Sequence, residues 1–136
     1  MSPKIKDIRK IYTKYPKLFR KNCITCHNGW CDIIDQMCST IQVYIDNEIY
    51  DKKIQPEFVY IKEKFGVLDI EIKDGDEIVG FLKKSCEKLS CHTCEYCGEL
   101  GELYCSSKHR NWSILKTLCL DHAIELYFYK LYKQKE

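Results

Sequence analysis

Two pairs of cysteine and histidine residues near the end of the chain could together bind one metal ion. Cys94 and Cys97 are separated by two residues, and so are Cys119 and His122. Two thiolates at this spacing can bind one ion from a tight turn, and a Cys/His pair can complete a tetrahedron around Zn²⁺. Four protein ligands leave no position open for water, which favours a structural site over zinc-dependent hydrolysis. The sequence therefore predicts one structural zinc ion.

Two further cysteines compete for this site. Cys91 forms a second Cys-x-x-Cys pair with Cys94, and Cys105 lies between the two halves of the motif. We prefer the four ligands named above because both pairs then have the same spacing and Gly98 follows the first pair, where the chain must turn sharply. Cys105 or Cys91 remains an alternative to one of these ligands.

A second group of potential ligands lies in the N-terminal third: Cys23, Cys26, His27 and Cys31. A second zinc ion could bind there, but the spacing of the remaining cysteines offers no convincing partner pair. The same run matches the pattern for c-type haem attachment, which generally requires export. Free thiols in a reducing compartment are the alternative, and we expect disulfides less.

The composition is that of a soluble globular protein. The chain has 136 residues, of which 45% are hydrophobic and 31% charged, enough for a single domain. We see no apolar run of the roughly 20 residues that a membrane span needs. We also see no secretion signal, so we expect a cytoplasmic protein without membrane partners. If the source is a virus, the expected location is the cytoplasm of the host.

Charge is distributed unevenly along the chain. Residues 1–21 carry eight Lys or Arg against one Asp, a charge of +7; residues 22–82 carry five against twelve acids, −7; and residues 83–136 carry nine against seven, +2. A basic arm on an acidic body could contact nucleic acid or an acidic partner. Alternatively, it forms a solvated helix face or neutralises its own body.

Hydrophobic periodicity predicts an α+β fold, with helices around a small antiparallel hairpin or sheet. We expect helices over residues 3–15, from about residue 32 to 49, over 76–89, and from about 119 onward. We expect a hairpin of strands 58–62 and 67–73 and short β-like segments at 103–105 and 114–118. Pro16 should end the first helix at Tyr15.

The apolar stripes of the helices identify their expected buried faces. They are Ile34, Met37, Cys38, Ile41, Ile45 and Ile49 in the central helix, Ile78, Leu82, Cys86 and Leu89 in the next, and Ala123, Ile124, Tyr127 and Leu131 in the last. We interpret residues 1–136 as one domain, with a basic arm (1–21), an α+β core (22–90) and a zinc module (91–136). The order of elements in the module is similar to a treble-clef zinc finger.

Three stretches together resemble a family of small bacterial and phage proteins. They are a Gly-Trp helix start within 29–38, a Lys-Glu-Lys-Phe-Gly hairpin within 61–68, and the zinc motif within 93–98 and 115–123. The resemblance implies a prokaryotic or phage setting and the same four zinc ligands, but no activity. The chain departs from the family pattern at Cys31, where an aromatic residue is expected, and at His27-Asn28, where Gly-Asp is expected.

These observations favour a non-enzymatic, zinc-stabilised protein that binds a protein partner, in the host machinery if the source is a phage. The alternative is a nucleic-acid-binding regulator that uses the basic arm and a basic loop on the zinc module. A nuclease or thiol-dependent enzyme is less favoured, because the sequence shows no catalytic constellation. The oligomeric state stays open. The candidate contact residues are Trp30, Lys62, Glu63, Lys64, Lys108, Arg110 and Trp112.

Overall fold

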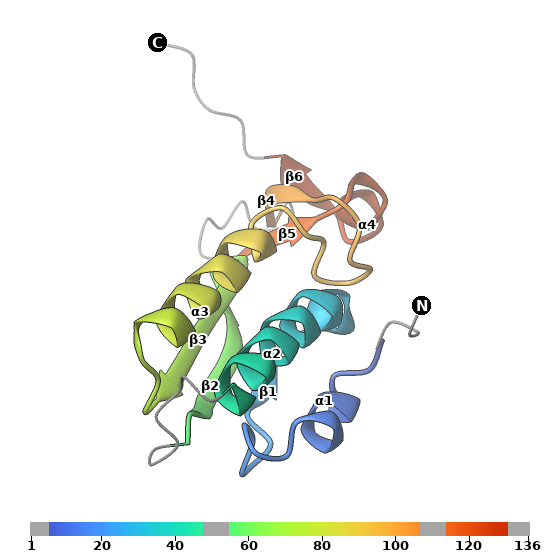
Figure 1. Ribbon diagram of the computed structural model, residues 1–136. Helices are drawn as coiled ribbons and strands as arrows, with labels where there is room; N and C mark the ends of the chain where they lie inside the picture. Colours follow the sequence, from blue (N-terminus) through green and yellow to red (C-terminus); the bar gives the residue numbers. More distant parts are fainter. Residues whose placement is uncertain (1–5, 48–54, 107–113, 131–136) are drawn as a thin grey trace.

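A computed structural model describes residues 6–47, 55–106 and 114–130, which form an α+β fold as predicted (Figure 1). Two sheets of three strands each are combined with helices. In chain order, the elements are α1 (Arg9–Lys14), β1 (Ile24–Thr25), the 3₁₀ turn η1 (Asn28–Trp30), α2 (Cys31–Asp46), β2 (Glu57–Lys64), β3 (Val67–Lys73), α3 (Glu77–Ser90), β4 (Glu102–Ser106), β5 (Leu115–Leu118), α4 (Leu120–Glu125) and β6 (Phe128–Lys130).

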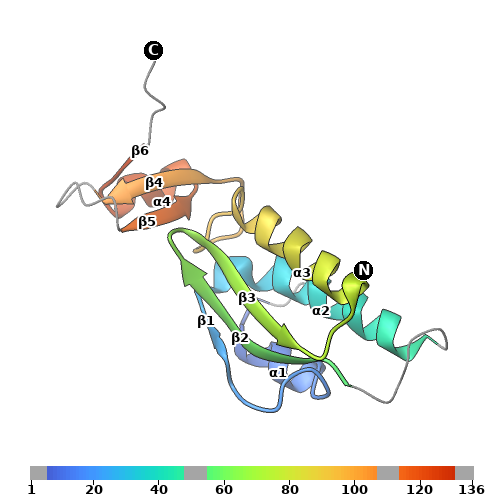
Figure 2. The same cartoon turned by 90° about the vertical axis from the view of Figure 1, so that its left-hand side faces the viewer.

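The larger part of the molecule, here called the body, comprises α1 to α3 and the sheet β1-β2-β3. β1 is parallel to β2, whereas β2 and β3 form the predicted antiparallel hairpin. Leu68 and Ile70 are buried, while Asp69 and Glu71 lie on the other, less buried face of β3, as the two-residue period requires. Figure 2 shows α2 and α3 covering one side of this sheet. The main hydrophobic core lies between these layers.

The first helix is shorter than predicted. It starts at Arg9 rather than at residue 3, although it ends before Tyr15 and Pro16 as expected. Residues 6 and 7 are not helical. The amide of Ile8 donates to Asn28 Oδ1 at 3.1 Å, a contact with a distant segment that sequence periodicity does not register.

The central helix α2 buries the described members of its predicted stripe, from Ile34 to Ile45. The helix α3 begins after Asp76, whose carboxylate accepts the amides of Ile78 and Val79 at 3.0 Å each. Its buried face differs from the prediction, because the side chains of Ile78 and Leu89 are 49% and 48% exposed. The helix instead turns Val79 and Ser90 inward.

The second sheet, of order β5-β4-β6, belongs to the C-terminal module, defined here as residues 91–106 and 114–130. The strands β4 and β5 lie where they were predicted. The last helix was expected to continue through Tyr127, but α4 ends at Glu125 and Tyr127 takes a left-handed φ of 59°. The chain then enters β6, which pairs with β4. The prediction failed because this pairing is a tertiary interaction.

The module contacts the body at two places that lie far apart in the sequence. At the first, the amide of Gly29 donates to Glu95 O at 2.7 Å, and Trp30 Nε1 donates to Thr93 O at 2.8 Å. Trp30, one of the candidate contact residues, is fully buried. It therefore anchors the module to the body and is not available for contact at the surface.

At the second place, the tip of the β2–β3 hairpin meets the second sheet. Thr117 Oγ1 donates to Gly66 O at 2.7 Å. A Cβ at Gly66 would lie 2.7 Å from Leu103 Cδ1, so the glycine permits this close approach. Within the described residues, no helix combines the length and the apolar character that crossing a bilayer requires.

Candidate metal centre

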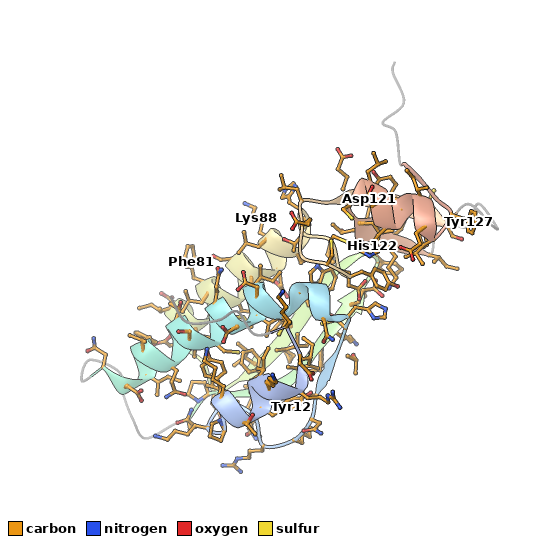
Figure 3. The ribbon with its side chains drawn as sticks, turned by 90° about the vertical axis from the view of Figure 1, so that its right-hand side faces the viewer. Tyr12, Phe81, Lys88, Asp121, His122 and Tyr127 are labelled. Atoms are coloured by element: carbon orange, nitrogen blue, oxygen red, sulfur yellow. The ribbon has the colours of Figure 1, made fainter. Side chains whose placement is uncertain are left out.

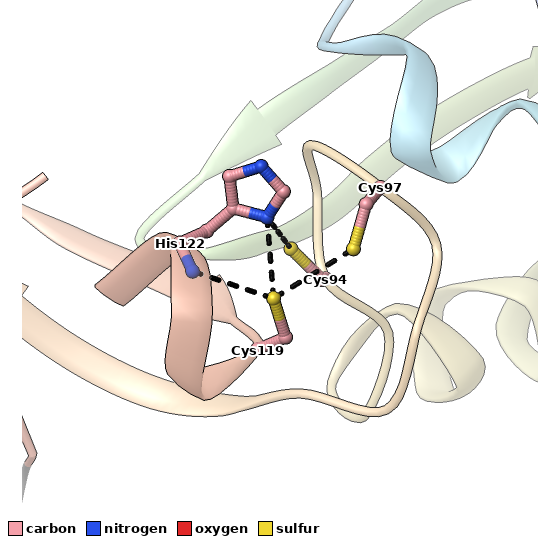
Figure 4. A group of neighbouring side chains, drawn as sticks. All are labelled: Cys94, Cys97, Cys119 and His122. Atoms are coloured by element: carbon pink, nitrogen blue, oxygen red, sulfur yellow. Dashed lines mark hydrogen bonds between the residues drawn. The ribbon is translucent and has the colours of Figure 1, made fainter. Parts of the chain in front are cut away.

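The four predicted zinc ligands lie together in the module. The ligand atoms of Cys94, Cys97, Cys119 and His122 all lie within 4.8 Å of one another. His122 Nδ1 is 3.6 Å from Cys94 Sγ and 3.2 Å from Cys119 Sγ, and the Sγ atoms of Cys97 and Cys119 are 3.7 Å apart (Figure 4). Over residues 6–47, 55–106 and 114–130 no other such group of metal-ligating side chains is found. This cluster could hold a metal ion.

The spacing of the ligand atoms fits a tetrahedral ion. Zinc–sulfur bonds of about 2.3 Å and zinc–nitrogen bonds of about 2.0 Å imply S···S and S···N edges of roughly 3.8 and 3.5 Å. The measured S···S edge of 3.7 Å and S···N edges of 3.6 and 3.2 Å agree with those values. Three sulfurs and one imidazole nitrogen are also the donor types that structural zinc prefers. The residues present therefore fit this metal.

The turn between Cys94 and Cys97 aims both thiols at the centre. The amide of Gly98 donates to Cys94 O at 2.9 Å, and the amide of Cys94 donates to Glu99 O at 2.7 Å. Gly98 has a φ of 83°, a left-handed conformation that glycine adopts without steric cost. The predicted need for a glycine after the first pair is confirmed.

The second pair comes from the start of α4. Cys119 is the N-cap residue, and its sulfur accepts the amide of His122 at 3.4 Å. Residues three apart in a helical turn lie on the same side, so both side chains reach the same ion. Figure 3 shows His122 on the side of α4 that faces the body, whereas Asp121 lies away from it.

The electrostatics of the thiols fit a site that needs a cation. Burial opposes ionisation of Cys94, but hydrogen bonds from the backbone at Cys119, Cys97 and Tyr96 lower its pKa. Burial raises the pKa of Cys97 to about 11, and hydrogen bonds with the sulfurs of Cys94 and Cys119 contribute in the same direction. One thiolate thus hinders the formation of the next, and a bound divalent ion would relieve that repulsion.

The alternative ligands lie outside the cluster. Cys105 is buried in β4, and Cys91 Sγ interacts with Glu87 O at 3.7 Å. Neither belongs to the group of gathered ligand atoms. Of the ligand sets that the sequence left open, the structure brings together the one in which both pairs have the same spacing.

The N-terminal group of Cys23, Cys26, His27 and Cys31 is not gathered in this way. Burial raises the pKa of Cys26 to about 12 and that of Cys31 to about 11, so both thiols stay protonated at neutral pH. Cys23 and Cys31 belong to the hydrophobic core of the body. In this arrangement they behave as small apolar side chains and not as ligands.

Two residues inside the first ligand pair have roles that the sequence analysis missed. The ring of Tyr96 stacks between His27, at a centroid distance of 4.1 Å, and the metal-site residue His122, at 5.7 Å. Glu95 is 1% exposed, and its Oε2 accepts the amide of His27 at 3.2 Å. Their position between two ligands was the only signal available in the sequence.

The buried carboxylate of Glu95 is paired with Lys116. Lys116 Nζ lies 3.0 Å from Glu95 Oε1 and 3.4 Å from Glu63 Oε1, so one ammonium group joins the ligand turn, β5 and β2. Burial opposes its charge, but the two carboxylates raise the pKa of Lys116. These contacts fix the metal centre against the hairpin of the body.

The remaining contact candidates occupy different environments. Glu63 is engaged internally, since its Oε2 also accepts the amide of Gly66 at 2.7 Å. Lys62 Nζ lies over the ring of Tyr60, 4.4 Å from the centroid. Lys64 is exposed. Three further candidates lie outside the described residues: Lys108, Arg110 and Trp112.

Part of the basic arm is paired with the acidic body. Lys14 Nζ lies 3.1 Å from Asp35 Oδ1, and Arg20 Nε lies 3.6 Å from Glu57 Oε1. Of the readings left open by the sequence, these contacts favour an arm that neutralises its own body. They leave fewer cations for a polyanion.

Comparisons of the chain with protein-family models, curated proteins and solved structures find no match. Function is therefore inferred from the chemistry of the site itself.

Proposed function

We propose that this chain is a non-enzymatic protein-binding module whose C-terminal part is held in shape by one Zn²⁺. The four gathered ligand atoms of Cys94, Cys97, Cys119 and His122 carry the proposal. When bound, the ion would crosslink the ligand turn to α4 and supply folding free energy that the small core of the module lacks. The order of ligand turn, hairpin and helix supports the similarity to a treble clef.

The closed ligand set supports a structural role. Catalytic zinc sites keep one position open for water, whereas three thiolates and one imidazole fill a tetrahedron. Among the described residues, the contacts of His122 with the thiols of Cys94 and Cys119 belong to this ligand set. A thiol and an imidazole that hold an ion are not available as a nucleophile and its base, which supports a binding function over catalysis.

A protein partner is favoured over nucleic acid because cations of the arm are neutralised within the chain, at Lys14 and Arg20. The resemblance to bacterial and phage proteins supports a partner in a prokaryotic cell. If the source is a phage, the partner belongs to the host machinery.

Native mass spectrometry of the reduced full chain tests the metal. We expect one zinc per wild-type chain, none in Cys97→Ser, and one in the control Cys105→Ser. A metal-free wild-type chain with an intact fold would contradict the proposal. Affinity capture with the tagged full chain from nuclease-treated prokaryotic lysate tests the partner. A protein retained by the wild-type chain and lost with Cys97→Ser is expected.

A further inference from the structure

A shallow, open pocket of about 620 Å³ lies between the tip of the β2–β3 hairpin and the C-terminal half of α3. Its apolar lining includes Phe65 and Leu68, and its charged rim includes Lys64, Lys84 and Lys88. We call it the lysine-rimmed pocket. Lys88 lies near the end of α3 beside the module, as Figure 3 shows. The pocket is separate from the metal centre and from the ion pair of Lys116.

Phe65 is placed in this pocket at an energetic cost. Its φ is 53° and that of Gly66 is 88°, a pair of positive values that a two-residue turn normally satisfies with Asn-Gly. A bulky side chain is unfavourable in the left-handed region. Phe65 is also 57% exposed, so burial in the core does not compensate. An exposed, strained aromatic residue is explained if a partner covers it.

The rim of the pocket carries charges of both signs. Within the described residues, no carboxylate lies within salt-bridge distance of Lys64, Lys84 or Lys88, whereas Lys14 and Lys116 are paired. Two carboxylates also line the pocket, those of Asp69 and Glu87. Glu87 Oε2 is already engaged, because it accepts the amide of Ile70 at 2.9 Å. The rim therefore presents three ammonium groups that can bind anionic groups of a ligand.

The pocket does not offer a sheet edge for strand addition. β3 is the outer strand of its sheet, but the two outward amides that lie nearest the pocket are occupied. The amide of Leu68 donates to Ser90 Oγ at 2.9 Å, and that of Ile70 donates to Glu87. An arriving strand would find these donors unavailable. A ligand must therefore bind through its side chains.

We propose that the lysine-rimmed pocket docks an acidic peptide segment of the partner protein, with an apolar side chain on Phe65 and carboxylates on the lysines. This inference rests on the proposed binding function and names the chemistry of its partner. Charge complementarity selects carboxylates at the rim, and the apolar lining selects an aliphatic or aromatic side chain. A nucleic acid fits less well, because a continuous phosphate backbone would have to pass close to Asp69 in the pocket and Glu71 on the same face of β3, whereas a peptide needs to place only a few carboxylates, at the three lysines.

A random peptide library displayed on phage and selected on the zinc-loaded full chain tests the proposal. We expect enriched peptides in which Asp or Glu residues flank an apolar residue. Replacing Lys84 and Lys88 together by Glu should weaken their binding at least about tenfold, since two attractive contacts become repulsive. The matched control replaces Lys10 and Lys17, two exposed lysines of the arm, by Glu and should leave affinity unchanged.

Phe65→Asn separates a binding role from a structural one. Asn tolerates the left-handed conformation, so this variant should melt at a higher temperature than the wild type while losing peptide affinity. If Phe65 served only the fold, Phe65→Asn should melt at a lower temperature than the wild type.

Four results would overturn the proposal. The first is a peptide consensus that is basic or uncharged, and the second is the absence of enriched peptides. The third is equal binding of the enriched peptides by the wild type and the Lys84/Lys88 variant. The fourth is binding of a short oligothymidylate that is lost in the same variant, which would assign the pocket to nucleic acid. If a captured partner binds the Lys84/Lys88 variant as well as it binds the wild type, this inference fails while the proposed binding function stands. If the wild type captures no partner, the binding function itself fails.

Discussion

Glu95 and Lys116 form an ion pair of 3.0 Å at the boundary between the metal centre and the body, with the Glu95 side chain almost completely shielded from water. Glu95 lies between two metal ligands, and Lys116 comes from β5. Because Lys116 also reaches Glu63 on β2, the pair connects the ligand turn to the hairpin that carries the lysine-rimmed pocket. The ion pair thus links the metal centre to the hairpin that contributes Lys64 and Phe65 to the proposed docking surface.

Removing one charge of this pair should lower the free energy of unfolding more than removing both charges. Lys116→Met leaves the buried Glu95 carboxylate uncompensated and is expected to lower the free energy of unfolding by about 3 kcal/mol. Adding Glu95→Gln to that variant should recover part of the loss, since the unpaired buried charge is then absent. Urea unfolding of the zinc-loaded chains provides the measurement. Equal stability of Lys116→Met and the wild type would show that the pair is not buried in solution.

Removal of the metal should release Trp30 from the module. The indole of Trp30 donates to Thr93 O, one residue before the first ligand. The chain has two tryptophans, so the experiment uses a Trp112→Phe background in which Trp30 is the only indole emitter. A strong chelator should shift its emission to longer wavelengths, and added zinc should reverse the shift. Unchanged emission despite the loss of zinc would show that the contact between Trp30 and Thr93 does not depend on the metal.

Two glycines offer a matched test of the close approach between η1 and the module. A Cβ at Gly29 would lie 2.3 Å from Glu95 O and 2.4 Å from Cys94 O, so Gly29→Ala should cost about 3 kcal/mol of stability. A Cβ at Gly80, inside α3, would meet no atom within 4 Å. Gly80→Ala should stabilise the chain by about 0.5–1 kcal/mol through helix propensity. Thermal unfolding of both variants would reveal whether their changes in stability have opposite signs.

The N-cap of α3 should make stability depend on acidic pH. Burial opposes ionisation of Asp76, but hydrogen bonds from Tyr44 and from the amides of Val79 and Ile78 lower its pKa below 3.8. A carboxyl group with a lowered folded-state pKa contributes stability above its unfolded pKa, and this contribution is lost as pH falls through the folded value. Asp76→Asn keeps a capping side chain without the charge. The wild type should therefore lose stability relative to Asp76→Asn below about pH 4, by less than about 1 kcal/mol because the carboxylate is exposed. A constant difference between the two proteins from neutral to acidic pH would contradict this assignment.

The elements that were predicted correctly are those whose signal is local. The stripe of α2 repeats at helical spacing, and β3 alternates apolar and polar residues at a period of two. The four gathered ligand residues were identified because each pair lies within one turn of chain, which brings its two side chains together almost regardless of the surroundings.

The features that were missed depend on contacts between distant segments. β6 forms because β4 offers it a free edge, which overrides the apolar stripe that had suggested a longer helix. The inward face of α3 is selected by the sheet it covers, so Ile78 and Leu89 stay exposed although their spacing favours burial. Trp30 is buried because Gly29 lets the module approach.

Periodicity and ligand spacing act over a few residues, so the types and order of most elements and the residues that could share a metal ion were predictable from the sequence. The attachment of the module to the body through Glu95, Lys116 and Trp30 depends on long-range packing and emerges only in the folded chain. The fold also brings a strained Phe65 together with Lys64, Lys84 and Lys88, which form no ion pair among the described residues, around one pocket. Such relationships depend on the packing of segments from β2, β3 and α3, which no local pattern encodes.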